Sequence, residues 1–145
     1  MLKKIRVVPL AAESLGVRSM CTYVETSDVK ILLDAGVSLC PSRFGLPPHP
    51  MEFQKIDESR KEIARAADYA DVVTLSHYHF DHHTPSFEDW LVNWTREVET
   101  ARQIYQEKTV LVKNPRENIN FSQRRRGWMF KKTGGKYAKI LEIAD

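Results

Sequence analysis

The 145-residue chain lacks the features of a membrane protein or of a disulfide-bonded secreted protein. Its longest apolar run, Val7 to Ala12, includes Pro9 and is far shorter than the roughly 18 residues that a membrane-spanning helix needs. That run is also too short for the hydrophobic region of a secretory signal. Two cysteines, Cys21 and Cys40, do not make a disulfide framework. We therefore expect a cytoplasmic protein that has no membrane association.

The charges are unevenly distributed along the chain. The net charge is +3, but residues 101–145 carry 11 basic and 4 acidic side chains, whereas residues 1–100 carry 11 basic and 15 acidic ones. Such an asymmetry indicates either an anionic partner or substrate, or only a solvated basic face. The apolar share of 42% is that of an ordinary globular protein, and the length suits one domain.

The hydrophobic pattern alternates between strands and helices, which predicts an α/β fold in a single domain, residues 1–145. The predicted strands are Lys3–Leu10, Met20–Thr26, Val29–Asp34, Asp71–Ser76, Thr109–Val112 and Tyr137–Ile143. The predicted helices are Asp57–Tyr69, a second helix that starts near Ser86, and Ile119–Lys132. A stripe at helical spacing predicts that the second helix packs on the sheet; its members are Phe87, Leu91, Trp94, Val98, Ala101 and Tyr105.

Four of the five histidines lie in residues 77–83, directly after a compact apolar strand. Side chains alternate between faces in an extended backbone, so His77, His79 and Asp81 would point the same way. His82 follows as the chain turns. Imidazoles and a carboxylate that meet at one point are ligands of Zn²⁺ and related ions. Open α/β sheets place their sites at this end of a strand, so the segment predicts a metal site.

The pattern His-x-His-x-Asp-His over residues 77–82 resembles the motif of the metallo-β-lactamase superfamily. The turn Asp34–Gly36 resembles that superfamily's Asp-x-Gly motif, and the segments 14–19, 45–50 and 119–124 are similar to an archaeal branch of it. The resemblance implies an αββα sandwich, in which mixed sheets are flanked by helices. It also implies one or two metal ions at the sandwich edge. Zinc is the expected metal, with iron or manganese as alternatives.

The resemblance further implies a role for each motif residue. His77 and His79 would help to bind a first metal ion, and Asp81 and His82 a second one. Asp34 would orient the site, unless it is only a turn aspartate. A bound divalent ion lowers the pKa of its water towards neutrality, and Asp81 would act in catalysis by accepting a hydrogen bond from that water. The expected reaction is hydrolysis of a small ester, amide, thioester or phosphoester substrate.

No histidine follows His83, although the superfamily normally supplies further ligands downstream of its motif. The chain would then correspond to the N-terminal half of such a domain. A lone half leaves apolar faces uncovered, and we expect these faces to form a homodimer or to bind a complementary C-terminal half. A non-catalytic half-domain that acts through a partner is the alternative.

The segment 124–132 gives a further alternative. Arg124, Arg125 and Arg126 could bind phosphate groups, either of a small substrate or of a nucleic acid, and the aromatic residues between the basic ones could stack on bases. In the plainer interpretation the arginines face water and Trp128 packs inward. A nucleic-acid-processing protein is therefore the second functional hypothesis.

Overall fold

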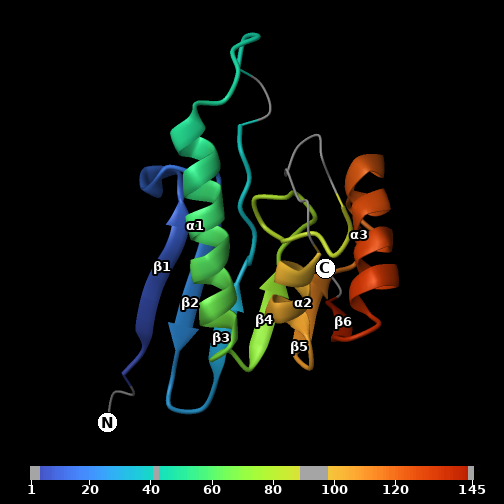
Figure 1. The fold of residues 1–145 in the computed structure, drawn as a ribbon. Coiled ribbons are helices and arrows are strands. Elements are labelled where there is room, and N and C mark those ends of the chain that lie inside the picture. The colour runs from blue at the N-terminus through green and yellow to red at the C-terminus, as the bar shows by residue number, and fades with distance from the viewer. Residues whose placement is uncertain (1–3, 41–42, 89–97, 144–145) are drawn as a thin grey trace.

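The computed structural model describes residues 4–40, 43–88 and 98–143. It shows an α/β fold with one six-stranded mixed sheet, in the strand order β1-β2-β3-β4-β5-β6 (Figure 1). Strands β1 to β3 form an antiparallel meander, and β3 to β6 run parallel to one another. The strands are β1 (Arg6–Ala12), β2 (Met20–Glu25), β3 (Lys30–Leu33), β4 (Val72–Leu75), β5 (Thr109–Lys113) and β6 (Lys139–Ile143).

Three α-helices connect the parallel strands: α1 (Pro50–Ala67), α2 (Glu99–Tyr105) and α3 (Phe121–Gly134). Each connection joins a strand to its immediate parallel neighbour, and crossovers of one hand in one direction place their helices on the same face. In Figure 1, α1 and α2 lie in front of the sheet and α3 stands beside its β6 end. The helices contact each other in the order α1, α2, α3.

The core lies between this helical layer and the sheet. Leu32, Val73 and Val110 point from the central strands into it and are fully buried, as is Ile63 of α1. Side chains on the other face of the strands are much less covered. That face, which we call the open sheet face, carries Val7, Met20, Ile31, Leu33, Leu141 and Ile143. Val7 and Met20 are 59% and 66% exposed, and no described helix or strand covers them.

All six predicted strands are confirmed, with small shifts at their ends. Helix α1 begins earlier than predicted, at Pro50, because His49 caps it. The His49 Nδ1 atom accepts a hydrogen bond from the Met51 amide at 3.2 Å, and the Glu52 carboxylate accepts one from the His49 amide at 2.6 Å. This reciprocal arrangement is a capping box in which an imidazole replaces the usual hydroxyl or carboxylate.

The predicted start of the second helix at Ser86 is wrong. Ser86 lies in a bend, and its hydroxyl lies 2.5 Å from the Thr133 hydroxyl of α3 instead of capping a helix. The described helix is α2 alone, in which Ala101 and Tyr105 are buried as predicted. Leu91 and Trp94 of that prediction lie outside the described residues. Among the described helices, none is long and apolar enough to cross a membrane.

Candidate functional site

The candidate site lies at the carboxyl edge of the sheet, where β3 and β4 end side by side. Leu33 of β3 pairs with Thr74 of β4, and the Asp34 amide donates to the Thr74 carbonyl at 3.0 Å. The turn 34–36 and the histidine segment 76–83 therefore leave the sheet next to each other. Two motifs that are separated by about forty residues in the sequence thus meet because parallel strands end at the same edge.

Asp34 connects the turn 34–36 to the histidine segment. One carboxylate oxygen accepts a hydrogen bond from the Ser76 amide at 2.7 Å, and the other accepts from the Ser76 hydroxyl at 2.8 Å and lies 2.9 Å from His82 Nδ1. Burial opposes ionisation of Asp34, but the hydrogen bonds from His82 and Ser76 outweigh it. The pKa of the Asp34 carboxyl therefore lies below its ordinary value.

This contact orients His82. An ionised carboxylate only accepts hydrogen bonds, so His82 Nδ1 carries the proton that bonds to Asp34. In the neutral ring, Nε2 then holds the lone pair, and it faces Asp81 Oδ2 at 3.6 Å. An imidazole that is fixed by a carboxylate behind it is a typical arrangement of metal-binding histidines. The role predicted for Asp34, orientation of the site, stays a prediction.

His77 and His79 form the other half of the cluster. Their ring nitrogens, Nε2 of His77 and Nδ1 of His79, lie 3.0 Å apart, and the His77 and His82 ring centroids are 3.9 Å apart. Burial lowers the pKa of both imidazoles. The neighbouring histidines lower the pKa of His77 further, and His79 is held below its ordinary value although Asp81 acts in the opposite direction. Both rings are thus favoured in the neutral form, which has a nitrogen lone pair.

The turn 34–36 also holds the backbone of the histidine segment. A Cβ atom on Gly36 would lie 2.2 Å from the His83 amide nitrogen, so only glycine allows this approach. The Ala35 carbonyl accepts hydrogen bonds from both the amide and the hydroxyl of Thr84, each at 2.8 Å. The Tyr105 hydroxyl of α2 bonds to the Thr84 backbone from the other side. The segment is therefore fixed at its far end as well as at Ser76.

His83 is a structural member of the segment. It is fully buried against the rings of Tyr78, Phe80 and Phe130, and burial lowers its pKa to about 4. Its Nδ1 atom donates to the His79 carbonyl at 3.0 Å, whereas its Nε2 atom has no hydrogen-bond partner. The neutral ring therefore braces the backbone of His79 and does not take part in the cluster.

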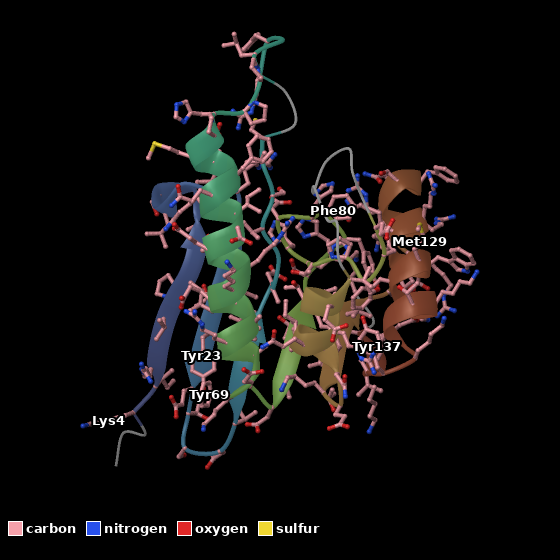
Figure 2. All side chains as sticks on the ribbon, in the orientation of Figure 1. Lys4, Tyr23, Tyr69, Phe80, Met129 and Tyr137 are labelled. Atoms are coloured by element: carbon pink, nitrogen blue, oxygen red, sulfur yellow. The ribbon has the colours of Figure 1, made fainter. Side chains whose placement is uncertain are left out.

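Two guanidinium groups approach the cluster, and sequence analysis predicted a role for only one of them. Arg18, from the loop before β2, contacts Asp81 Oδ2 through Nη2 at 3.3 Å. Arg126 of α3 lies over the Phe80 ring, with its Cζ atom 4.3 Å from the ring centroid. Figure 2 shows Phe80 near the upper end of the sheet, beside the helix that carries Met129. Arg18 had no recognisable signal, because its partner is 63 residues away.

The three arginines predicted to act together point to different places. Only Arg126 reaches the histidine segment, where Nη1 lies 3.5 Å from the Tyr78 carbonyl. Arg124 donates to the Arg116 carbonyl at 3.1 Å, and Arg125 is exposed. The expectation that Trp128 packs inward is wrong, since its side chain is 60% exposed and Phe130 fills the core instead.

The donor atoms have the composition of a metal site but do not close around one point. In the part of the chain that the structure describes, no three histidine, cysteine, aspartate or glutamate side chains are placed so that they could hold a metal ion together. The donors instead form contacting pairs, His77 with His79 and His82 with Asp81. The residue types are those that bind metal ions, and they lie close together. A bound ion would nevertheless require additional or rearranged ligands.

Comparison with known proteins shows similarity to proteins named UPF0282. The UPF0282 protein of Thermococcus gammatolerans is 52% identical over 141 residues, which are 97% of this chain and 46% of that protein. That of Pyrobaculum calidifontis is 57% identical over 122 residues (84% and 40%), and that of Methanocaldococcus jannaschii 46% identical over 141 residues (97% and 47%). The chain spans about half the length of these curated relatives. No family model and no solved structure matches it.

The assignment to the metallo-β-lactamase superfamily is therefore wrong. The relatives carry the name UPF0282, and none of their names refers to a metallo-β-lactamase. The physical reason for this error is that the motif of residues 77–82 shows only that metal-binding donor atoms follow a strand. Such local chemistry does not identify a family, because unrelated proteins reach the same arrangement.

Proposed function

We propose that the carboxyl edge of the sheet is one side of a divalent-metal site in a hydrolase. The observation that carries the proposal is the orientation of His82 by Asp34, at 2.9 Å, next to the contacting pair His77 and His79. Zinc is the metal that these donors suit best. When bound, such an ion supplies a water molecule that is ionised near neutral pH.

The residues of this chain would prepare that chemistry. His77, His79 and His82 would provide nitrogen ligands, and Asp34 would keep His82 in the tautomer whose Nε2 is free to bind. The Asp81 carboxylate, 15% exposed, would provide an oxygen ligand and accept a proton from the attacking water. The proposed substrate is a small ester, amide or phosphoester.

A zinc titration of the 145-residue chain tests the proposal. Isothermal calorimetry should show saturable binding, and His79→Ala and His82→Ala should each weaken it at least about tenfold, as expected for the loss of one ligand or its support. His49→Asn is the matched control. It removes a histidine outside the cluster and keeps a side chain that caps α1. The absence of zinc binding, or equal affinity in the His79 variant, would contradict the proposal.

We further propose that the open sheet face is covered by a second layer that completes the site. Leu141 and Ile143 are 42% and 50% exposed there, and an uncovered apolar face of this kind marks an interface. The relatives are about twice as long as this chain, so the segment outside the matched region is large enough to form such a layer. Of the two occupants expected from the sequence, a second copy of the chain and a complementary C-terminal half, we propose the second.

Apolar-dye fluorescence and light scattering test the covering layer. The 145-residue chain should bind the dye, Leu141→Lys should reduce that binding, and the full-length Thermococcus gammatolerans relative should bind much less. Phe121→Lys is the control, because Phe121 is an exposed apolar residue that belongs to α3 and to no strand of the sheet. A stable dimer that Leu141→Lys dissociates would show instead that a second copy occupies the face.

A second candidate function, binding of single-stranded nucleic acid, is favoured by the surface of α3. Trp128 is exposed, and Lys132 Nζ lies 4.9 Å from the centroid of its ring. An exposed ring beside basic groups can stack on a base while the cations neutralise phosphates. Fluorescence anisotropy with a single-stranded RNA should show salt-dependent binding, which Trp128→Ala weakens about tenfold and Phe121→Ala leaves unchanged. Binding that is insensitive to Trp128→Ala would exclude this candidate.

A further inference from the structure

The two edges of the six-stranded sheet differ in how they are protected against pairing. β1 forms one edge and β6 forms the other, on opposite sides of the molecule in Figure 1. An edge strand has unpaired backbone groups that can bond to a further strand, so proteins block such edges with proline, bulges or charged side chains. An edge that lacks these features along most of its length is available for pairing.

The β1 edge is blocked in the middle of the strand. Pro9 has no amide hydrogen to donate, and the pairing register with β2 shifts between Pro9 and Ala11, as at a β-bulge. The strand also begins with a charged residue, Arg6. These features interrupt regular pairing, and β1 is therefore a poor template for another strand.

The β6 edge has neither a proline nor a bulge. Residues 139–143 contain no proline, and they pair with β5 in an unbroken register. The carboxylate of Glu142 bonds to Lys131, and the Arg116 guanidinium lies 2.6 Å from its other oxygen, so that its charge is compensated within the protein. The remaining charge, Lys139, lies at the first residue of the strand. The edge thus has little protection beyond its first residue.

Alternate backbone groups of β6 point away from the sheet. The Lys139 amide donates to the Lys108 carbonyl next to β5 at 3.0 Å, which fixes the phase of the ladder. Every second residue of a parallel strand bonds to the same neighbour, so Leu141 bonds to β5 as well. The amides and carbonyls of Ile140 and Glu142 therefore point outward. Within the described ranges, no backbone or side-chain group bonds to them, and β6 pairs with β5 alone.

The side chains of β6 indicate what kind of strand fits beside it. Leu141 and Ile143 lie on the open sheet face and are exposed, whereas Ile140 lies on the opposite face and packs partly against the core. Side chains of paired strands lie next to each other on the same face of a sheet. A strand with apolar residues on the open sheet face would therefore cover Leu141 and Ile143.

We infer that a seventh strand pairs with β6 in the longer relatives, and that the region outside the match with this chain supplies it. The inference rests on the proposed covering layer and states where that layer joins the sheet. The match covers only 46% of the Thermococcus gammatolerans relative and 47% of the Methanocaldococcus jannaschii relative, so more than half of each protein is available to form the strand. Pairing would give the outward groups of Ile140 and Glu142 their hydrogen-bond partners.

Amide hydrogen exchange followed by NMR tests the inference. In the 145-residue chain, the Ile140 amide should exchange at least about 100-fold faster than the Leu141 amide, because only the latter is held in the ladder. In the full-length Thermococcus gammatolerans relative, the amide aligned with Ile140 should exchange at least about 100-fold more slowly than it does in the chain. Leu141 is the matched control, since its amide bonds to β5 and should exchange slowly in both proteins.

The other edge of the sheet provides a second control. The β1 amides that point away from β2 should exchange rapidly in the chain and in the relative. Rapid exchange at the Ile140 position of the relative, or equal slowing of the outward β1 amides, would overturn the inference. Slow exchange of Ile140 in the chain itself, at concentrations at which light scattering detects a dimer, would show that a second copy occupies the edge and would also overturn it.

The exchange rates and the dye test separate this inference from the proposed covering layer. A relative that binds little apolar dye but exchanges the Ile140 amide rapidly would retain the covering layer and refute the seventh strand. A relative that slows the Ile140 amide but binds as much dye as the chain would retain the seventh strand and refute the covering layer. Zinc binding enters neither measurement, so the metal-site proposal is tested independently.

Discussion

Replacing Gly36 by alanine should disrupt the candidate site more than alanine at any other glycine of the chain. The new Cβ atom would lie 2.2 Å from the His83 amide nitrogen, 2.6 Å from the His82 carbonyl carbon and 2.8 Å from the His82 amide nitrogen. All three are backbone atoms of a segment that is fixed at Ser76 and at Thr84. The clash can therefore be relieved only by moving the histidine segment away from Asp34.

Overpacking of this kind costs about 3 kcal/mol, which corresponds to a fall of roughly 10 °C in the melting temperature of a chain of this size. Thermal unfolding followed by circular dichroism measures the fall, and zinc titration should show weaker binding as well. Gly134→Ala is the matched control. Its Cβ would lie 3.4 Å from its nearest neighbour, the Ser86 hydroxyl, which is an ordinary contact, and alanine favours helix formation. If Gly36→Ala has the melting temperature of the wild-type chain, the result would contradict the close packing of Gly36 against the backbone of His82 and His83.

Three further outcomes can be measured. Asp34→Asn should weaken zinc binding about 10- to 100-fold in calorimetry, because asparagine keeps a single acceptor oxygen, for which His82 and Ser76 would compete, and loses the negative charge. A thiol reagent should label exposed Cys40 in the folded protein and Cys21 only after unfolding, since burial and then the charge of Asp34 raise the pKa of the Cys21 thiol. The pKa of Glu142 lies below its ordinary 4.5 because of its bond to a lysine, so its small stabilising effect is present above pH 4.5 and is lost as the pH falls through the lower value. Chemical unfolding of Glu142→Gln should therefore differ from wild type by less than about 1 kcal/mol near neutral pH and by nothing in strong acid.

The parts of the fold that depend on local pattern could be predicted from the sequence. Apolar runs with turn residues between them located every strand, and the histidine segment was correctly placed after β4. The turn 34–36 was also recognised. Its proximity to the histidine segment follows from parallel pairing of β3 with β4, which places both strand ends at one edge.

The parts that depend on tertiary contacts could not be predicted. Arg18 meets Asp81 across 63 residues, and no spacing rule connects them. The apolar stripe predicted a helix that starts near Ser86, but Ser86 lies in a bend and its hydroxyl contacts the Thr133 hydroxyl of α3, a contact that no local pattern indicates. Trp128 and Phe130 are both aromatic and two residues apart, and only the packing of α3 decides that Phe130 is the buried one.

The open sheet face and the candidate site are physically connected, because the same strands build both. Leu33 lies on the open sheet face, opposite to buried Leu32, and the next residue is Asp34. The covering layer that we propose would, where it packs over Leu33, lie next to the edge at which Asp34 holds His82, and it could add ligands there. Zinc affinity should consequently be higher in a full-length UPF0282 relative than in the 145-residue chain, and Leu33→Lys in that chain should leave its own weaker zinc binding unchanged. Equal affinities in the chain and the relative would show that the proposed covering layer contributes nothing to the site.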